Sequence, residues 1–109
     1  MKLSDVATKL GLTVHCGAEL LEGEVTGGYV GDLLSDVMAG GREDQLWITR
    51  QVHPNIVAVA ALKELAGIVI VAEPEAETIA KAAAENVALF SSSQGAFDVS
   101  GRLYALLKD

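Results

Sequence analysis

The segment 45–71, QLWITRQVHPNIVAVAALKELAGIVIV, limits the possible folds of this chain more than any other stretch. Residues 46–49 are a short apolar run that favours a β-strand, and residues 67–71 are a second run, almost purely β-branched. The residues between the two runs are too many for a hairpin loop and suit a helix. A strand, a helix and a strand in this order predict a βαβ crossover, with the strands parallel and the connection right-handed.

The same alternation continues toward the C-terminus. The crossover helix is expected over residues 55–66. Pro74 can begin a second helix that Asn86 ends, a third strand is expected at 87–90, and a last helix runs from about 95 to 107. The predicted fold class is therefore α/β: a three-layer α/β/α domain with a small, mainly parallel sheet and helices on both faces.

The N-terminal third of the sequence is less regular. Ser4 can cap a short first helix, and a strand is expected at residues 12–15. Gly27 and Gly28 are expected to break or sharply bend an extended segment. One of the two is also expected to have a positive φ or to let another backbone come within contact distance. Asp32 and Ser35 are the two candidate caps for the short helix that comes next.

The charge of the chain excludes two classes of partner. Its 109 residues are expected to form one domain, and eight basic against fifteen acidic residues give a net charge of −7. Such a surface repels nucleic-acid phosphates and anionic lipid, so neither nucleic acid nor a membrane is an expected partner. The only cysteine, Cys16, cannot form an internal disulfide, and the first residues lack the apolar run of a signal peptide. We therefore expect a cytoplasmic protein.

Polar residues follow two of the predicted strands. In an open parallel sheet, ligands bind beyond the carboxyl ends of the strands, and each of these polar loops opens a helix whose free N–H groups favour an anion. Arg50 adds a positive charge. A purely structural role, as helix caps and as ion-pair partners, also remains open. The candidate ligand-binding residues in these loops are Thr49, Arg50, Gln51, His53, Asn55, Ser91, Ser92, Ser93 and Gln94.

A second candidate site is the turn Thr26, Gly27 and Gly28. Two adjacent glycines can expose successive N–H groups as a nest for an anion. The alternative is a bulge or turn that only redirects the strand. The spacing is neither a Walker loop, because no Gly-Lys-Ser/Thr follows, nor a dinucleotide fingerprint.

The sequence contains no pattern that predicts catalysis. His15, Cys16 and His53 are the only soft metal ligands, and their spacing matches no metal site. Nothing local brings Cys16 and His53 together as a nucleophile and its base. We therefore expect no metal, no cofactor and no enzymatic activity.

The Thr26-Gly27-Gly28 turn and its flanking residues resemble the DRTGG domain family. The matching stretches are EVTGGYVGDLLSDV from Glu24, LWITRQVHPNIVAVAALKELAGIVIV from Leu46 and FSSSQGAFDVSGRLY from Phe90, so the resemblance covers nearly the whole chain, 1–109. The Asp-Arg pair that gives the family its name is replaced by Glu24 and Val25, which keeps the acid in kind and loses the arginine.

The resemblance implies a fold similar to the N-terminal domain of HPr kinase/phosphorylase. It also implies a regulatory context, since domains of this family occur beside CBS domains in regulatory pyrophosphatases. The kinase label sometimes given to stand-alone members does not fit, because this chain lacks a P-loop. Two functions remain open. The leading one is a non-catalytic regulatory or assembly module that self-associates and acts with another protein. The alternative is a sensor for a small anionic ligand, such as an adenine nucleotide or a phosphorylated metabolite.

The hydropathy of the chain also points to self-association. A mean hydropathy of +0.35 leads us to expect more apolar surface than a monomer of this size can bury. A homo-oligomer is therefore expected, with a dimer favoured.

Overall fold

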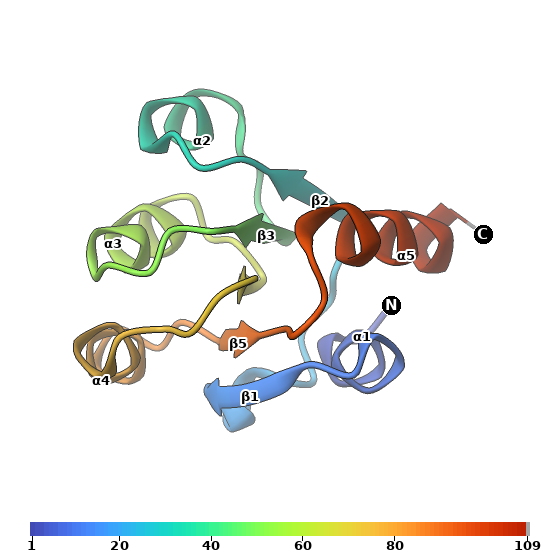
Figure 1. Cartoon of the computed structure of the whole chain (residues 1–109), viewed down its shortest axis with the longest axis horizontal. Coiled ribbons are helices and arrows are strands. Elements are labelled where there is room, and N and C mark those ends of the chain that lie inside the picture. The colour runs from blue at the N-terminus through green and yellow to red at the C-terminus, as the bar shows by residue number, and fades with distance from the viewer. Residues whose placement is uncertain (109) are drawn as a thin grey trace.

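The computed structural model describes residues 1–108 and shows one five-stranded sheet with helices on both faces (Figure 1). The strands are β1 (Thr13–Cys16), β2 (Gly27–Val30), β3 (Gln45–Thr49), β4 (Gly67–Ile70) and β5 (Leu89–Ser91). They lie in the order β1-β5-β4-β3-β2, and only β1 runs antiparallel to its neighbour. The predicted three-layer α/β/α fold with a mainly parallel sheet is confirmed.

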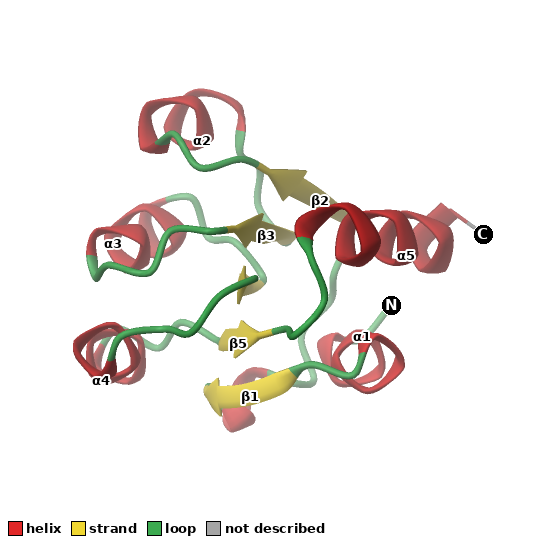
Figure 2. Ribbon diagram, viewed as in Figure 1, coloured by secondary structure: helices red, strands yellow, loops and turns green. Residues whose placement is uncertain are grey.

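The helices form the two outer layers (Figure 2). They are α1 (Leu3–Leu10), α2 (Leu34–Gly40), α3 (Asn55–Leu62), α4 (Ala76–Ala84) and α5 (Ala96–Lys108), and a short 3₁₀ helix spans Ala18–Leu20. Helices α2, α3 and α4 cover one face of the sheet, and α1 and α5 cover the other. Within residues 1–108, no helix has both the length and the apolar content that crossing a membrane requires.

The central strands have a buried side chain on both faces. In β3, Leu46 and Ile48 pack toward α1 and α5, whereas Trp47 packs toward α2, α3 and α4. All residues of β4 are buried as well. A strand buried on both faces reads as a continuous apolar run, which is why these strands were visible in the sequence. The indole Nε1 of Trp47 donates a hydrogen bond of 2.8 Å to the Gly31 carbonyl and so leaves no buried donor unpaired.

The predicted crossover is correct, but its helix ends early. β3 and β4 pair in parallel, with Trp47 opposite Ile68. Helix α3 ends at Leu62 because Glu64 has φ +54° and the Leu65 N–H donates to the Ala60 carbonyl, which is a Schellman stop. Helix α4 ends in the same way at Asn86, with φ +57°, as its sequence predicted.

Two N-terminal predictions are wrong. Ser4 lies inside α1 and does not cap it: the first free N–H groups donate instead to carbonyls of the loop before β2, with the Leu3 N–H bonded to Gly23 and the Ser4 N–H to Leu21. Gly27 and Gly28 do not break the chain, because both lie within β2 and neither has a positive φ.

Gly28 is required by the packing of α5. A Cβ atom at this position would lie 2.9 Å from Cδ2 of Leu103, a buried side chain of α5. The closest approach is therefore made by a side chain of a helix. The predicted contact with another backbone is limited to the Leu46 carbonyl oxygen, 3.7 Å from that Cβ position on the neighbouring strand. The glycine lets α5 lie directly on the strand at the edge of the sheet.

We predict that two glycines with positive φ differ sharply in their tolerance of alanine. Gly11 has φ +65° and open space around it, whereas a Cβ at Gly17, φ +93°, would lie 2.6 Å from the Ala88 Cα. Gly11→Ala should lower the free energy of unfolding by about 1 kcal/mol, the cost of the left-handed conformation alone. Gly17→Ala should lower it by about 3 kcal/mol or more, because backbone must also move. Urea unfolding of both variants measures the difference, and equal losses would contradict this account.

Candidate functional site

The twelve residues predicted to bind a ligand lie in three separate places. Thr26 precedes β2, whereas Arg50 and Ser92 follow β3 and β5. Because β2, β3 and β5 are parallel, the Thr26–Gly28 turn lies at the opposite end of the sheet from the two polar loops. The loops themselves are separated by β4, which lies between β3 and β5.

The loop after β3 is held by a carboxylate whose role the sequence did not reveal. Oδ1 of Asp32 accepts hydrogen bonds of 2.8 Å from the Thr49 hydroxyl and 2.8 Å from the Arg50 N–H. The Gln51 side chain donates to the Asp32 carbonyl at 2.9 Å, and the Gln51 N–H donates to the Thr49 hydroxyl at 3.1 Å. Asp32 therefore joins the loop after β2 to the loop after β3, and it does not cap α2, whose N-cap is Leu33.

A shallow pocket of about 250 Å³ lies over this loop and includes Arg50, Gln51 and His53. The Arg50 guanidinium is exposed and has no ion-pair partner within residues 1–108. His53 is engaged, since its Nδ1 lies 2.9 Å from a carboxylate oxygen of Glu75. The Asp32 carboxylate already occupies a hydroxyl and an N–H that could have bound an anion, so Arg50 is the main attraction left for one. Asn55 is the exposed first residue of α3.

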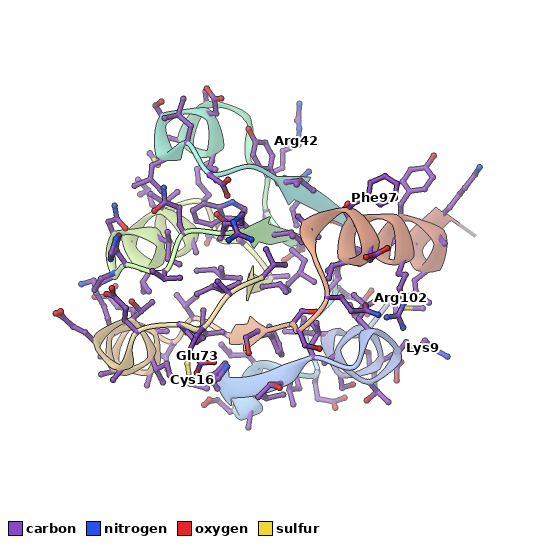
Figure 3. The ribbon with its side chains drawn as sticks, in the orientation of Figure 1. Lys9, Cys16, Arg42, Glu73, Phe97 and Arg102 are labelled. Carbon is purple, nitrogen blue, oxygen red and sulfur yellow. The ribbon has the colours of Figure 1, made fainter. Side chains whose placement is uncertain are left out.

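The loop after β5 is held mainly by contacts within the chain. Nε2 of His15 lies 2.7 Å from the Ser91 hydroxyl, across the antiparallel β1–β5 pair. The Gln94 N–H donates to the Ser92 hydroxyl at 3.0 Å, and Arg102 donates to the Gln94 side chain at 2.6 Å. Arg102 also donates to the Lys9 carbonyl at 2.6 Å, which joins α5 to α1 (Figure 3). Ser93 is exposed.

Neither nucleophile near this edge is activated. No carboxylate within residues 1–108 bonds to His15, so the pair with Ser91 has no third group to orient the imidazole. Burial raises the pKa of the Cys16 thiol, which keeps it in the unreactive protonated form at neutral pH. Residues 1–108 contain no group of three side chains that could hold a metal ion.

A groove of about 510 Å³ lies between β2 and α5. Gly27, Gly28 and Val30 line it from the strand, and Ser100 and Tyr104 are among the residues that line it from the helix. Among the described residues that line the groove none is acidic, and Lys108 is the only charged one. The predicted Thr-Gly-Gly turn therefore belongs to an apolar groove, which we call the β2–α5 groove.

The groove is rimmed by large apolar side chains in contact with solvent. Val30 is 54% exposed and Tyr104 is 67% exposed. Phe97 precedes Tyr104 by two helical turns, lies on the same side of α5, and is 89% exposed (Figure 3). The sequence holds one signal for this face: Phe97 and Tyr104 are seven residues apart and so share one side of α5, apart from the buried Val99 and Leu103.

The electrostatics of the groove suit an uncharged occupant better than an anion. Lys108 is the last residue of α5, so the groove end near Thr26 and Gly27 lies beside the negative end of the helix dipole. The Lys108 ammonium offsets that charge and lies 5.6 Å from the Tyr104 ring centre. Without positive φ values, Gly27 and Gly28 also do not form an anion nest.

No protein-family model matches the sequence, and no curated protein matches it. The fold is similar to a crystal structure of the CBS and DRTGG domains of the regulatory region of Clostridium perfringens pyrophosphatase, complexed with its activator, diadenosine tetraphosphate. The TM-score is 0.70 at 15% sequence identity, and the match covers 94% of this chain and 45% of that chain. This chain thus spans less than half of the length of the chain in that structure. The predicted resemblance to a DRTGG domain is confirmed at the level of the fold.

We predict that the Asp32 carboxylate stabilises the loop after β3. Asp32→Ala should lower the free energy of unfolding by about 1–3 kcal/mol, because the hydroxyl of Thr49, a residue only 1% exposed, loses its acceptor. Asp32→Asn keeps an accepting oxygen and should cost less. Asp36→Ala, in the first turn of α2, is the control and should change stability by about 0.5 kcal/mol. Urea midpoints compare the three variants, and a loss at Asp32 no larger than at Asp36 would contradict the assignment.

Proposed function

We propose that this chain is a single DRTGG-like domain, a non-catalytic regulatory module that works in the cytoplasm by self-association and by contact with another protein. The observation that carries the proposal is the β2–α5 groove, where a strand at the edge of the sheet lies beside exposed apolar side chains. Apolar patches of this kind on a small domain mark surfaces that bind other proteins.

The location of the exposed apolar side chains supports self-association, whereas the total accessible surface of the domain does not. The accessible surface is 5,633 Å², and a monomer of 11.4 kDa is expected to expose about 5,800 Å². The fold therefore buries as much surface as an ordinary monomer, in contrast to the reasoning from mean hydropathy. What favours association is that Val30, Phe97 and Tyr104 are exposed on and around one groove.

The regulatory part of the proposal draws on the similar structure. That protein is the regulatory region of an enzyme and not its catalytic part. Because the identity is 15%, the shared fold is the basis for this transfer of function.

We predict that wild-type protein is a dimer at tens of micromolar and that Tyr104→Lys weakens the dimer at least about tenfold. The substitution places an ammonium group beside Lys108 in a surface that association must bury. Leu62→Lys is the matched control, because Leu62 is 68% exposed but lies on α3, over the opposite face of the sheet. Sedimentation velocity gives the dissociation constants. A monomeric wild type at hundreds of micromolar, or equal effects of the two substitutions, would refute the proposal.

The second candidate function is a sensor for a small anionic ligand. It is favoured by the unpaired Arg50 guanidinium in the pocket after β3, next to the start of α3. The similar structure was solved with diadenosine tetraphosphate, which makes an adenine nucleotide the first ligand to test. In this function, Thr49, Gln51, His53 and Asn55 line or flank the site around Arg50. The serine loop and the Thr26–Gly28 turn lie elsewhere and remain separate candidates.

We predict for this second function that diadenosine tetraphosphate or ATP raises the melting temperature. At 100 times its dissociation constant, a ligand should stabilise the fold by about 2.7 kcal/mol. Arg50→Ala should weaken the effect most at low salt, where the wild-type contact is least screened. Arg42→Ala removes the same charge from the turn before β3 and should leave the effect unchanged (Figure 3). No shift with either nucleotide, or equal effects of the two substitutions, would exclude this site for these ligands.

A further inference from the structure

We propose that the partner at the β2–α5 groove is a second copy of this chain, and that β2 pairs antiparallel with β2 of that copy to join the two sheets into one. This inference rests on the proposed self-association and specifies its geometry. It follows from which backbone groups of β2 are free, which side chains flank them, and where the charges lie.

The outer edge of β2 offers free backbone groups at two residues. Gly27 and Tyr29 lie opposite Gln45 and Trp47, and the Gly31 N–H donates to the Ile48 carbonyl at 3.2 Å. Residues of a strand alternate in the direction of their N–H and C=O groups, so Gly27 and Tyr29 bond to β3. Gly28 and Val30 therefore direct their N–H and C=O groups to the open edge. Both residues are exposed.

The free edge has a definite length. Upstream of β2, the Val25 N–H donates to the Met1 carbonyl at 2.8 Å, and Lys2 forms an antiparallel bridge with Glu24. The N-terminus thus covers the edge as far as residue 25. Downstream, the chain leaves the sheet and enters α2 at Leu34. The exposed stretch is long enough for one short antiparallel ladder.

This stretch is complementary to itself about a two-fold axis at Tyr29. In that register Gly28 of each copy faces Val30 of the other and exchanges both N–H···O=C bonds with it, so all free groups of the edge are paired. On the groove side, the exposed Val30 of the second copy lies next to Gly28, where Leu103 of α5 fills the place of the missing side chain and gives the valine an apolar neighbour. The two Tyr29 residues face each other as a cross-strand aromatic pair, on the opposite face of the sheet.

The distribution of charge selects a second copy over a charged peptide. Residues 25–31 carry no charged side chain. The groove lining within residues 1–108 contains no acid to attract a basic segment and only Lys108 to attract an acidic one. Two copies with a net charge of −7 each repel one another, so a contact between them requires an uncharged face. In the proposed register Asp32 faces Thr26 of the other copy, and no two acids lie directly opposite.

The area that a stable dimer needs brings α5 into the interface. A specific contact buries about 800 Å² per partner, roughly a seventh of the 5,633 Å² surface, and a four-residue strand covers only part of that. Phe97 and Tyr104 extend the apolar face beside β2 and can supply the rest. The other edge strand, β1, has one large exposed apolar side chain, Val14, and the pocket at its end beside Cys16 has a volume of only about 140 Å³.

The test compares Val30→Pro with Val30→Ala. Alanine removes both γ carbons of valine, and proline keeps one as part of its ring, so proline loses no more apolar side chain than alanine does. Only proline removes the outward N–H, and proline is tolerated on an edge where that N–H faces solvent. We expect the dimer of the proline variant to have a dissociation constant at least about tenfold higher than that of the alanine variant, as measured by sedimentation velocity. Circular dichroism spectra of equal shape and intensity show that both variants are folded. A folded proline variant that dimerises as well as the alanine variant would overturn the strand pairing.

Amide hydrogen exchange of the wild type tests the pairing without a substitution. The N–H groups of Gly28 and Val30 should exchange more slowly as protein concentration rises, whereas the Tyr29 N–H, bonded to β3, should exchange slowly at every concentration. A dimer in which Gly28 and Val30 show no added protection overturns the pairing and leaves the proposed self-association standing. A chain that stays monomeric overturns both.

Discussion

The burial of β3 and β4 on both faces is the constraint on which the rest of this structure depends. Their side chains alternate between two apolar clusters, so each face of the sheet needs its own cover of helices. Right-handed crossovers that proceed in one direction, from β2 to β5, place α2, α3 and α4 on one face. Only the two ends of the chain remain to cover the other face. They do so as α1 and α5, which Arg102 joins through the Lys9 carbonyl.

The cover provided by α5 explains both the glycine pair and the groove. The helix starts after β5 and crosses to β2, where Leu103 fits against the strand only because Gly28 has no side chain. One helix does not cover the whole width from β5 to β2, so Val30 stays exposed beside Tyr104. The same packing that completes the apolar core therefore leaves an unpaired strand edge with apolar side chains next to it. This is the physical basis for the proposed regulatory association.

The polar loops at the carboxyl end of the sheet illustrate how residues typical of a ligand site can also serve the fold. Asp32 binds the Thr49 hydroxyl and the Arg50 N–H, and His15 reaches Ser91. These contacts join elements that are 17 to 76 residues apart in the sequence. Among the described residues of these loops, Arg50 alone has a charge without an ion-pair partner. Its substitution therefore distinguishes a ligand sensor from loops with a purely structural role.

The sequence by itself determined the α/β class, the parallel order of the crossover strands, the helix stop at Asn86 and the resemblance to a DRTGG domain. These features depend on local patterns, such as β-branched runs buried on both faces, and such patterns can be recognised from neighbouring residues in the sequence. Only the tertiary structure decided that the Thr26–Gly28 turn and the polar loops lie at opposite ends of the sheet, that Asp32 is a loop acceptor, and that Phe97 and Tyr104 face solvent. Each of these depends on which distant elements meet, and contacts between distant elements are set by packing geometry, which the order of residues does not display.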